Sequence, residues 1–329
     1  MDWGAVLQSG LSEGIGPTGA VFALAAIGLN VHFGYTGLLN FGQAGFMAVG
    51  AYGLAASVQT WGLPFGVGLL VALAASVLLA ILLGIPTLRL RADYLAIVTI
   101  GAAEIIRIAF GSVTLRDWFG GSNGRQGFND PYNAANPFSS SIDLGVVTMR
   151  PGTAWAAVCT WAVVAISCVI VWALMRSPWG RVLKSIREDE EAVRSLGKNV
   201  FAYKMQALVL GGLFGSLAGV MLALSNNAVV PTDYATDTTF YVYAVLLLGG
   251  AARVLGPVVG SIIVWFLLSS LGSFFSQAAR EGLIPESIRD VNQASLVRFI
   301  VLGLAIMALM VFRPQGIFGD RRELAIDVR

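Results

Sequence analysis

The chain has 329 residues, of which 56% are hydrophobic and only 12% are charged, and its mean hydropathy is +0.75. Soluble domains carry about a quarter charged residues, so this composition excludes a water-facing globule and predicts an all-α, polytopic membrane protein. The net charge of +2 gives no indication of nucleic-acid binding. Cys159 and Cys168 lie on opposite faces of one apolar run, and His32 is the single histidine. We therefore expect no disulfide, no metal site and no cofactor bound by this chain.

Apolar runs long enough to cross a bilayer, which takes about 20 helical residues, recur along the whole sequence. Asp2 stands where a signal peptide would carry Lys or Arg, so we expect the first run to be retained as a span. The run at 238–252 is short and only Arg253 and Val254 separate it from the next, so this pair is either two spans or one broken, re-entrant element. We predict a single transmembrane helical bundle over 1–329 with about nine spans, within a range of about eight to ten. The expected spans are 17–33, 37–60, 64–85, 94–111, 153–175, 203–225, 238–252, 255–276 and 295–312.

Positive residues gather in the connection 176–204. Because Lys and Arg favour the cytoplasmic side, we place this connection in the cytoplasm of an inner-membrane protein. Alternating from it, nine spans put the N-terminus outside and the C-terminus in the cytoplasm. The other basic residues that this topology brings to the cytoplasmic side are Arg89, Arg91, Arg253, Arg313, Arg321, Arg322 and Arg329.

The connections on the predicted outer side are less basic. The longest, 112–152, is rich in Gly, Asn, Ser and Pro, which favour turns, and it is either an ordered external surface or a linker. Asp233 and Asp237 lie at an outer edge, where they either meet an external protein or are solvated loop carboxylates.

Small residues repeat every four positions inside two expected spans, at Gly211, Gly215 and Gly219 and at Gly256 and Gly260. This spacing stacks them on one helix face and allows a neighbouring backbone to come close. The pattern predicts a tightly packed bundle and carries no information about a ligand.

Polar residues inside spans are costly, and they usually face the bundle interior or a water-filled path. Asn40 and Gln43 share a helix face and either line a pathway or bond across helices, the second being commoner. Glu104 and Arg107 are also three apart and are expected to form an ion pair. Opposite charges suit an amino-acid zwitterion, although a pair that satisfies itself is the commoner finding. With Thr99, these four residues are our candidates for a translocation path.

The segment 176–204 is the most informative soluble stretch. Pro178 and Gly180 are expected to turn the chain as it leaves the membrane. The spacing of apolar residues predicts a short amphipathic helix over 188–195, with Ala192, Val193 and Leu196 on one face and Gly197 at its end. Such a helix either docks to another protein or is a solvated connection.

Several blocks resemble a known family of transport proteins. Glu191-Ala192-Val193-x3-Gly197 resembles the Glu-Ala-Ala-x3-Gly loop that seats the permeases of bacterial ABC importers on their ATPase, with Val at the third position and no Ile-x-Leu-Pro after it. Further blocks are similar to the branched-chain amino acid permeases of the LivH/LivM type, and the sequence at 88–94 is more like LivM. These blocks are Gly-Leu-Asn at 28–30, Gly-Tyr-Thr-Gly-Leu-Leu-Asn-Phe-Gly-Gln-Ala-Gly at 34–45, Leu-Arg-Leu-Arg-Ala-Asp-Tyr at 88–94, Glu-Ile-Ile-Arg at 104–107, Arg-Ser-Pro-Trp-Gly-Arg at 176–181 and Phe-Arg-Pro-Gln-Gly at 312–316.

The resemblance implies a permease subunit of an ABC importer that moves branched-chain or related neutral amino acids by alternating access. It implies a second, homologous permease subunit, two cytoplasmic ATPase subunits that hold ATP and Mg, and an extracytoplasmic substrate-binding protein, all at the lipid membrane. No Gly-x4-Gly-Lys-Ser/Thr phosphate loop occurs in the sequence, which agrees with ATP hydrolysis on partner chains. The residues expected to couple to the ATPase are Arg181, Lys184, Arg187, Glu188, Glu191, Ala192 and Gly197.

Two alternatives remain. Permeases of the same superfamily also carry urea and short amides, and an ion-coupled secondary transporter would need no ATPase. An intramembrane enzyme would need a nucleophile and base or a metal site, which a chain with one histidine is poorly equipped to build.

Overall fold

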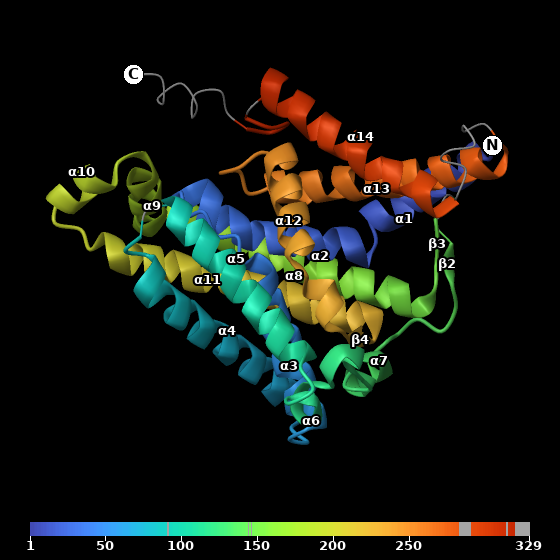
Figure 1. Cartoon of the computed structure of the whole chain (residues 1–329), viewed down its shortest axis with the longest axis horizontal. Coiled ribbons are helices and arrows are strands. Elements are labelled where there is room, and N and C mark those ends of the chain that lie inside the picture. The colour runs from blue at the N-terminus through green and yellow to red at the C-terminus, as the bar shows by residue number, and fades with distance from the viewer. Residues whose placement is uncertain (91, 144, 146, 283–290, 314, 320–329) are drawn as a thin grey trace.

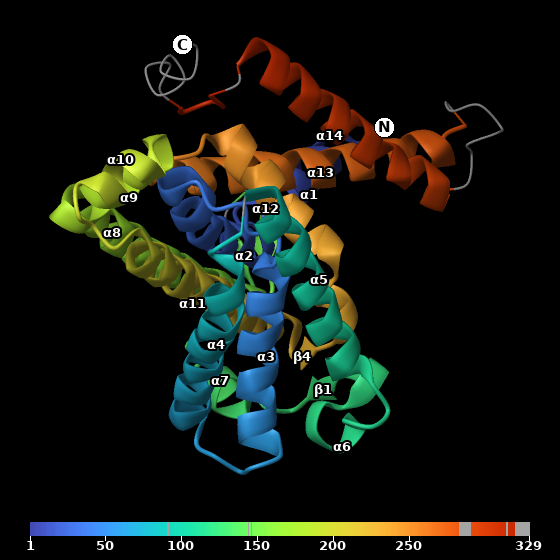
Figure 2. The ribbon, with the colours of Figure 1, turned by 60° about the vertical axis from the view of Figure 1, so that its left-hand side comes forward.

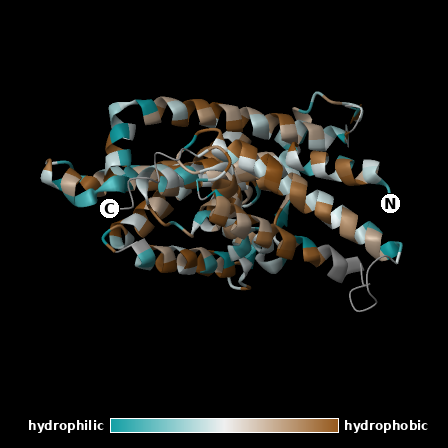
Figure 3. Ribbon diagram, turned by 90° about the horizontal axis from the view of Figure 1, so that it is seen from above, coloured by the Kyte–Doolittle hydropathy of each residue, from teal (hydrophilic) through white to brown (hydrophobic). Residues whose placement is uncertain are grey.

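The computed structural model of the chain describes residues 1–90, 92–143, 145, 147–282, 291–313 and 315–319, and these are mostly helical (Figure 1). Arg91 and the arginines at 321, 322 and 329, which contributed to the predicted orientation, lie outside them. Hydrophobic residues run along most of the helices, and hydrophilic ones gather at the end that carries α9 (Pro178–Glu188) and α10 (Glu190–Ser195) (Figure 3).

Six helices in the described residues are long and apolar enough to cross a membrane. They are α2 with its π-helical continuation η1 (Pro17–Leu29 and Asn30–Tyr35), α4 (Phe65–Thr87), α5 (Ala92–Gly111), α8 (Pro151–Arg176), α11 (Val200–Asn226) and α13 (Gly256–Arg280). The other three expected spans are helices too, but α3 (Gln43–Gln59) has 17 residues, α12 (Thr236–Gly249) has 14, and α14 (Val291–Phe312) contributes the shorter apolar stretch Leu296–Phe312. The full count of about nine spans therefore stays a prediction.

The centre of the bundle is built by α2, α3 and α11. Nearly all of α2 is buried, and small residues let its neighbours approach. A Cβ at Gly211 would lie 2.5 Å from the carbonyl oxygen of Gly28, and one at Gly219 would overlap the carbonyl oxygen of Met47. The predicted close packing at these glycines is thus confirmed.

The outer helices surround this centre. Figure 2 shows α3, α4 and α5 side by side, with α13 and α14 crossing above them. Leu70 on α4, Ile105 on α5 and Ile166 on α8 are exposed, as lipid-facing side chains would be.

A helix that the sequence did not lead us to expect, α1 (Trp3–Gly14), packs along α13, from Ile262 near its start to Gln277 near its end. The carboxylate of Asp2 caps it by accepting from the Ala5 amide at 3.1 Å. The N-terminal ammonium pairs with Glu281 just beyond α13, and Gly10 leaves room for the Phe266 ring. The N-terminal segment is therefore anchored to α13.

The predicted outer connection 112–152 is ordered where it is described. It contains α6 (Arg116–Phe119), η2 (Gly121–Asn123), α7 (Asp130–Ala134) and the antiparallel pair β2 (Ile142–Asp143) and β3 (Thr148–Met149). β1 (Arg125–Gln126) pairs with β4 (Ala228–Val229), next to η3 (Pro231–Tyr234). Of the two alternatives for this connection, the ordered surface is the one observed.

Helices α12 and α13 form an antiparallel hairpin, because Val245 and Gly249 lie against Gly260. Asn30 holds the turn between them: its Oδ1 accepts from the Ala252 amide and its Nδ2 donates to the Arg253 carbonyl, both at 2.8 Å. The 238–276 segment is therefore two helices that fold back on each other.

Candidate functional site

The exposed end at α9 and α10 begins with a sharp turn. α8 ends at Arg176, Ser177 is extended, and Pro178 starts α9 at the position where a missing N–H costs nothing. One face of α9 is buried through Leu183 and Ile186. The expected coupling residues on this helix, Arg181, Lys184, Arg187 and Glu188, lie among its exposed positions.

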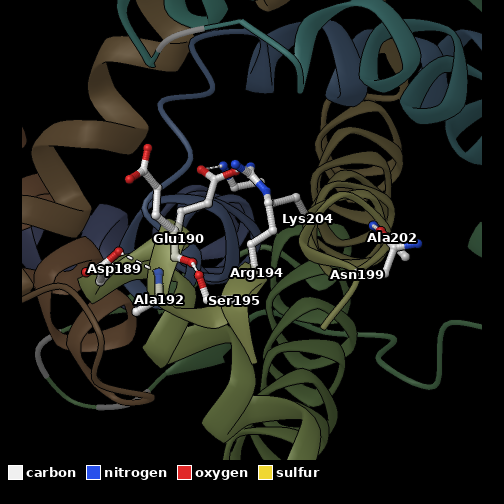
Figure 4. A network of polar contacts seen from close by, with 9 residues as sticks. Asp189, Glu190, Ala192, Arg194, Ser195, Asn199, Ala202 and Lys204 are labelled. Atoms are coloured by element: carbon white, nitrogen blue, oxygen red, sulfur yellow. Dashed lines mark hydrogen bonds and ion pairs between the residues drawn. The ribbon is translucent and has the colours of Figure 1, made fainter. Parts of the chain in front are cut away.

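α10 is held by its own charged residues (Figure 4). The Asp189 carboxylate accepts from the Ala192 amide at 2.9 Å. Glu190 accepts from Arg194 at 2.8 Å and pairs with Lys204 at the start of α11. The short helix is therefore fixed to the long one behind it.

The prediction for this helix was partly wrong. α10 begins at Glu190, after a separate helix, and only Val193 is buried. Ala192 and Leu196 are exposed, Leu196 by 80%, so these three residues do not share a buried face. Gly197 ends the helix as expected, with φ of +77° and its amide donating to the Arg194 carbonyl at 3.0 Å.

A solvent-facing hollow of about 880 Å³ lies between this segment, the end of α4 and the start of α11. Arg89, Lys198 and Lys204 line it together with the carboxylates of Glu188 and Glu191. The lining therefore carries both signs of charge together with the apolar ring of Phe201. The hollow has the size and mixed polarity of a surface that receives part of another protein.

Arg187 has a second role that spacing did not predict. Its Nη1 donates to the carbonyl oxygen of Gly34 at 2.5 Å, and Gly37, with φ of +73°, lies directly beneath its side chain. Gly34 belongs to η1, the end of the first long helix. Arg187 therefore ties the exposed end to the centre of the bundle.

At that centre, Asn40 and His32 are fully buried and bond to each other. Asn40 Nδ2 donates to His32 Nδ1 at 3.0 Å, because Asn40 Oδ1 already accepts from the Gly42 amide at 2.8 Å. His32 Nε2 then donates to the Leu208 carbonyl at 3.1 Å. Both ring nitrogens are used, which assigns a neutral, Nε2-protonated histidine. No role was predicted for His32 from the sequence, because its place next to Asn40 depends on a turn that residue spacing does not reveal.

The other polar candidates near this centre also bond within the protein. Gln43 Nε2 donates to the carbonyls of Ala25 and Gly211 at 3.1 and 3.4 Å. Thr99 Oγ1 accepts from the Phe41 amide and donates to the Ala96 carbonyl, both at 3.0 Å. The expected bonding across helices is confirmed for Gln43, which reaches α2 and α11. Asn40 lies in the irregular segment before α3, so the expectation that it shares a helix face with Gln43 was wrong. The place of Asn40, Gln43 and Thr99 on a translocation path stays a prediction.

The predicted ion pair on α5 is present. Arg107 donates from Nε and Nη2 to the two oxygens of Glu104 at 2.9 and 2.5 Å. Thr236, at the start of α12, donates to the same carboxylate at 3.4 Å. The side chains of Glu104 and Arg107 are 38% and 27% exposed, so the pair lies at an edge of the bundle, apart from Asn40 and Gln43.

These features define a class: a helical membrane protein with a charged, exposed segment at one end and a buried polar centre. Residues 14–311 match the family described as "Branched-chain amino acid transport system / permease component". The chain belongs to this family.

Curated relatives agree with the assignment. The high-affinity branched-chain amino acid transport system permease protein LivM of Salmonella typhimurium is 31% identical over 308 residues, which cover 90% of this chain and 67% of the relative. LivM of Escherichia coli is 30% identical with the same coverage. The nucleoside ABC transporter permease protein NupC of Lactococcus lactis is 24% identical over 85% of each chain. No solved structure matches the chain.

Proposed function

We propose that the chain is the membrane subunit of an ABC importer that moves branched-chain or related neutral amino acids across the inner membrane. Two separate ATPase subunits supply the energy, a second permease subunit completes the pathway, and an external binding protein delivers the ligand. The observation that carries this proposal is the family match over residues 14–311, joined to the exposed charged segment α9–α10.

The arrangement of that segment supports docking of an ATPase. Its apolar residues Leu183, Ile186 and Val193 are buried against the bundle. The surface left for a partner therefore consists of charged side chains and the exposed Leu196. A rigid segment transmits displacement better than a solvated loop, and the pairing of Glu190 with Lys204 supplies that rigidity.

Reconstitution tests the function. The chain is purified with its genetic neighbours, placed in lipid vesicles, and assayed for uptake of labelled leucine, uridine and urea with and without internal ATP. We expect uptake of leucine that needs both the ATPase subunits and ATP. Uptake by this chain alone on an ion gradient would instead support a secondary transporter, and ATP-dependent uptake of uridine or urea but not leucine would reassign the substrate.

Charge reversal tests the docking segment. Glu191 is exposed on α10, where a partner would touch it. We expect Glu191→Arg to lower ATP-driven uptake about tenfold or more, because an interfacial charge becomes repulsive, while the chain itself stays folded. Asp117→Arg makes the same change on exposed α6, far from α10, and is the matched control. Equal, unimpaired uptake by both variants would remove Glu191 from the docking surface.

A further inference from the structure

A second cavity, of about 500 Å³, lies between α2, α11, α12, α13 and α14. It sits where α1 and α11 end, away from the α9–α10 end of the molecule (Figure 1). Ligand sites for small molecules occupy about 300 to 1,000 Å³, so the space suffices for an amino acid. Neither the sequence motifs nor the docking segment account for it.

One side of this cavity is an aromatic wall. The rings of Phe22 and Trp265 are 4.7 Å apart, and Tyr241 lies 6.2 Å from both Trp265 and Phe299. Leu268 adds an aliphatic surface. Such a wall suits the side chain of an apolar ligand, whose burial contributes about 0.8 kcal/mol per CH₂ group.

Charged groups of both signs line the same cavity. Arg298 lies on α14, Glu13 at the end of α1 and Asp233 in η3. Among the described residues, Arg298 forms no ion pair with either carboxylate, and the carboxylate of Asp233 accepts only from Asn226 Nδ2, at 3.3 Å. Separate charges of opposite sign in a partly apolar space are costly unless something bridges them.

Two donors in the cavity also lack an acceptor within the described part of the chain. Arg298 Nε and Trp265 Nε1 are buried and have no hydrogen-bond partner there. The guanidinium of Arg298 is held in place by the Phe299 ring, 4.8 Å away, and by the bare backbone of Gly272, where a Cβ would come within 2.7 Å of Nη1. A positioned cation with a free N–H is the usual receiver of a carboxylate.

We propose that this cavity binds the zwitterion of an apolar α-amino acid. Arg298 receives its carboxylate, Asp233 and Glu13 receive its ammonium group, and the aromatic wall covers its side chain. The inference rests on the proposed function in one respect: it names a site on this chain for the same class of substrate.

Binding to the full chain in lipid nanodiscs tests the site, without ATP or partner subunits. The probe is radiolabelled L-leucine, with leucinamide and 4-methylpentanoate as competitors that each lack one charge. We expect Arg298→Gln to weaken leucine binding about ten- to a hundredfold, the effect of losing a charged hydrogen-bond partner. Arg298→Lys should restore part of it. Arg298→Gln should also abolish the preference for leucine over leucinamide, which a misfolded variant would not do selectively.

Asp233→Asn tests the group that receives the ammonium of the ligand, and we expect it to abolish the preference for leucine over 4-methylpentanoate. Matched controls are Arg280→Gln and Asp237→Asn, exposed residues of the same type outside the cavity lining. Both should bind leucine as the parent does.

The inference and the proposed function fail separately. If the complete complex takes up leucine with ATP while Arg298→Gln and Asp233→Asn leave leucine binding and the analogue preferences unchanged, the cavity is not a substrate site and the inference is overturned. If the chain binds leucine with the expected Arg298 dependence but the complex takes up no amino acid, the inference stands and the proposed function fails. Absence of leucine binding by the parent chain overturns the inference.

Discussion

The crossing of α2 and α11 gives the sharpest test of the packing. At Gly211 a methyl group would lie 2.5 Å from the Gly28 carbonyl oxygen and closer still to His32 Nε2. Neither neighbour can easily give way, since one is backbone and the other is bonded at both ring nitrogens. We expect Gly211→Ala to destabilise the chain by about 2 to 3 kcal/mol, the upper part of the range for an overpacked core.

The same substitution would also stabilise a helix by about 0.5 to 1 kcal/mol, because alanine loses less conformational entropy than glycine. The net loss of about 2 kcal/mol corresponds to a melting temperature about 3 °C lower for a chain of this length. Gly101→Ala on α5 is the control, because a Cβ there has nothing within 4 Å. Melting of detergent-purified protein, followed by size-exclusion recovery, makes the comparison. If Gly211→Ala melted at the same temperature as Gly101→Ala, the close crossing of α2 and α11 would be refuted.

Three more predictions follow from other parts of the molecule. Asn30→Ala should lower the melting temperature, since it leaves the Ala252 amide and the Arg253 carbonyl without their bonds, at about 1 kcal/mol each, and an unchanged melting curve would contradict this. Burial raises the pKa of Asp233 above its ordinary 3.8. The stability that the protonated form contributes is therefore complete below pH 3.8 and is lost as the pH rises through the higher pKa of the folded state. The melting temperature should fall with rising pH across this acidic range, and Asp233→Asn should flatten that dependence; an equal dependence in both proteins would rule this out. The predicted orientation is tested in a chain with Cys159 and Cys168 replaced by alanine, with a single cysteine at exposed Ser195 or Ser122. An impermeant maleimide should label position 195 from the cytoplasmic side and position 122 from the outer side, and labelling of both from one side would overturn the orientation.

Most of the fold could be predicted from the length of the hydrophobic runs and the spacing of the glycines. The expected spans correspond to helices, and the Gly211 series lies at the closest crossings, because length and small-residue periodicity are local properties. α1 was missed because its apolar residues are too few for a span, and its stability comes from packing on α13, far away in the sequence.

The polar sites were predictable only where both partners lie on one helix. Glu104 and Arg107 are three apart, so their pairing follows from helical geometry. His32 reaches Asn40 only because η1 and the irregular segment after it turn the chain back, and Arg298 reaches the 500 Å³ cavity only through the packing of α14 on α13. Long-range placement of this kind has no signature in residue spacing.

The contacts between the exposed segment and the buried centre form an unbroken series. Arg187 bonds the carbonyl of Gly34, Gly34 lies in η1 beside His32, and His32 bonds Asn40, whose carbonyl accepts from Tyr243 of α12 at 3.0 Å. Arg187 is exposed, but Gly34, His32, Asn40 and Tyr243 are buried, so little free space separates the later steps of the series. If α9 receives an ATPase as proposed, the Gly34 and Asn40 carbonyls and the His32–Asn40 side-chain bond are the contacts that join that surface to α12.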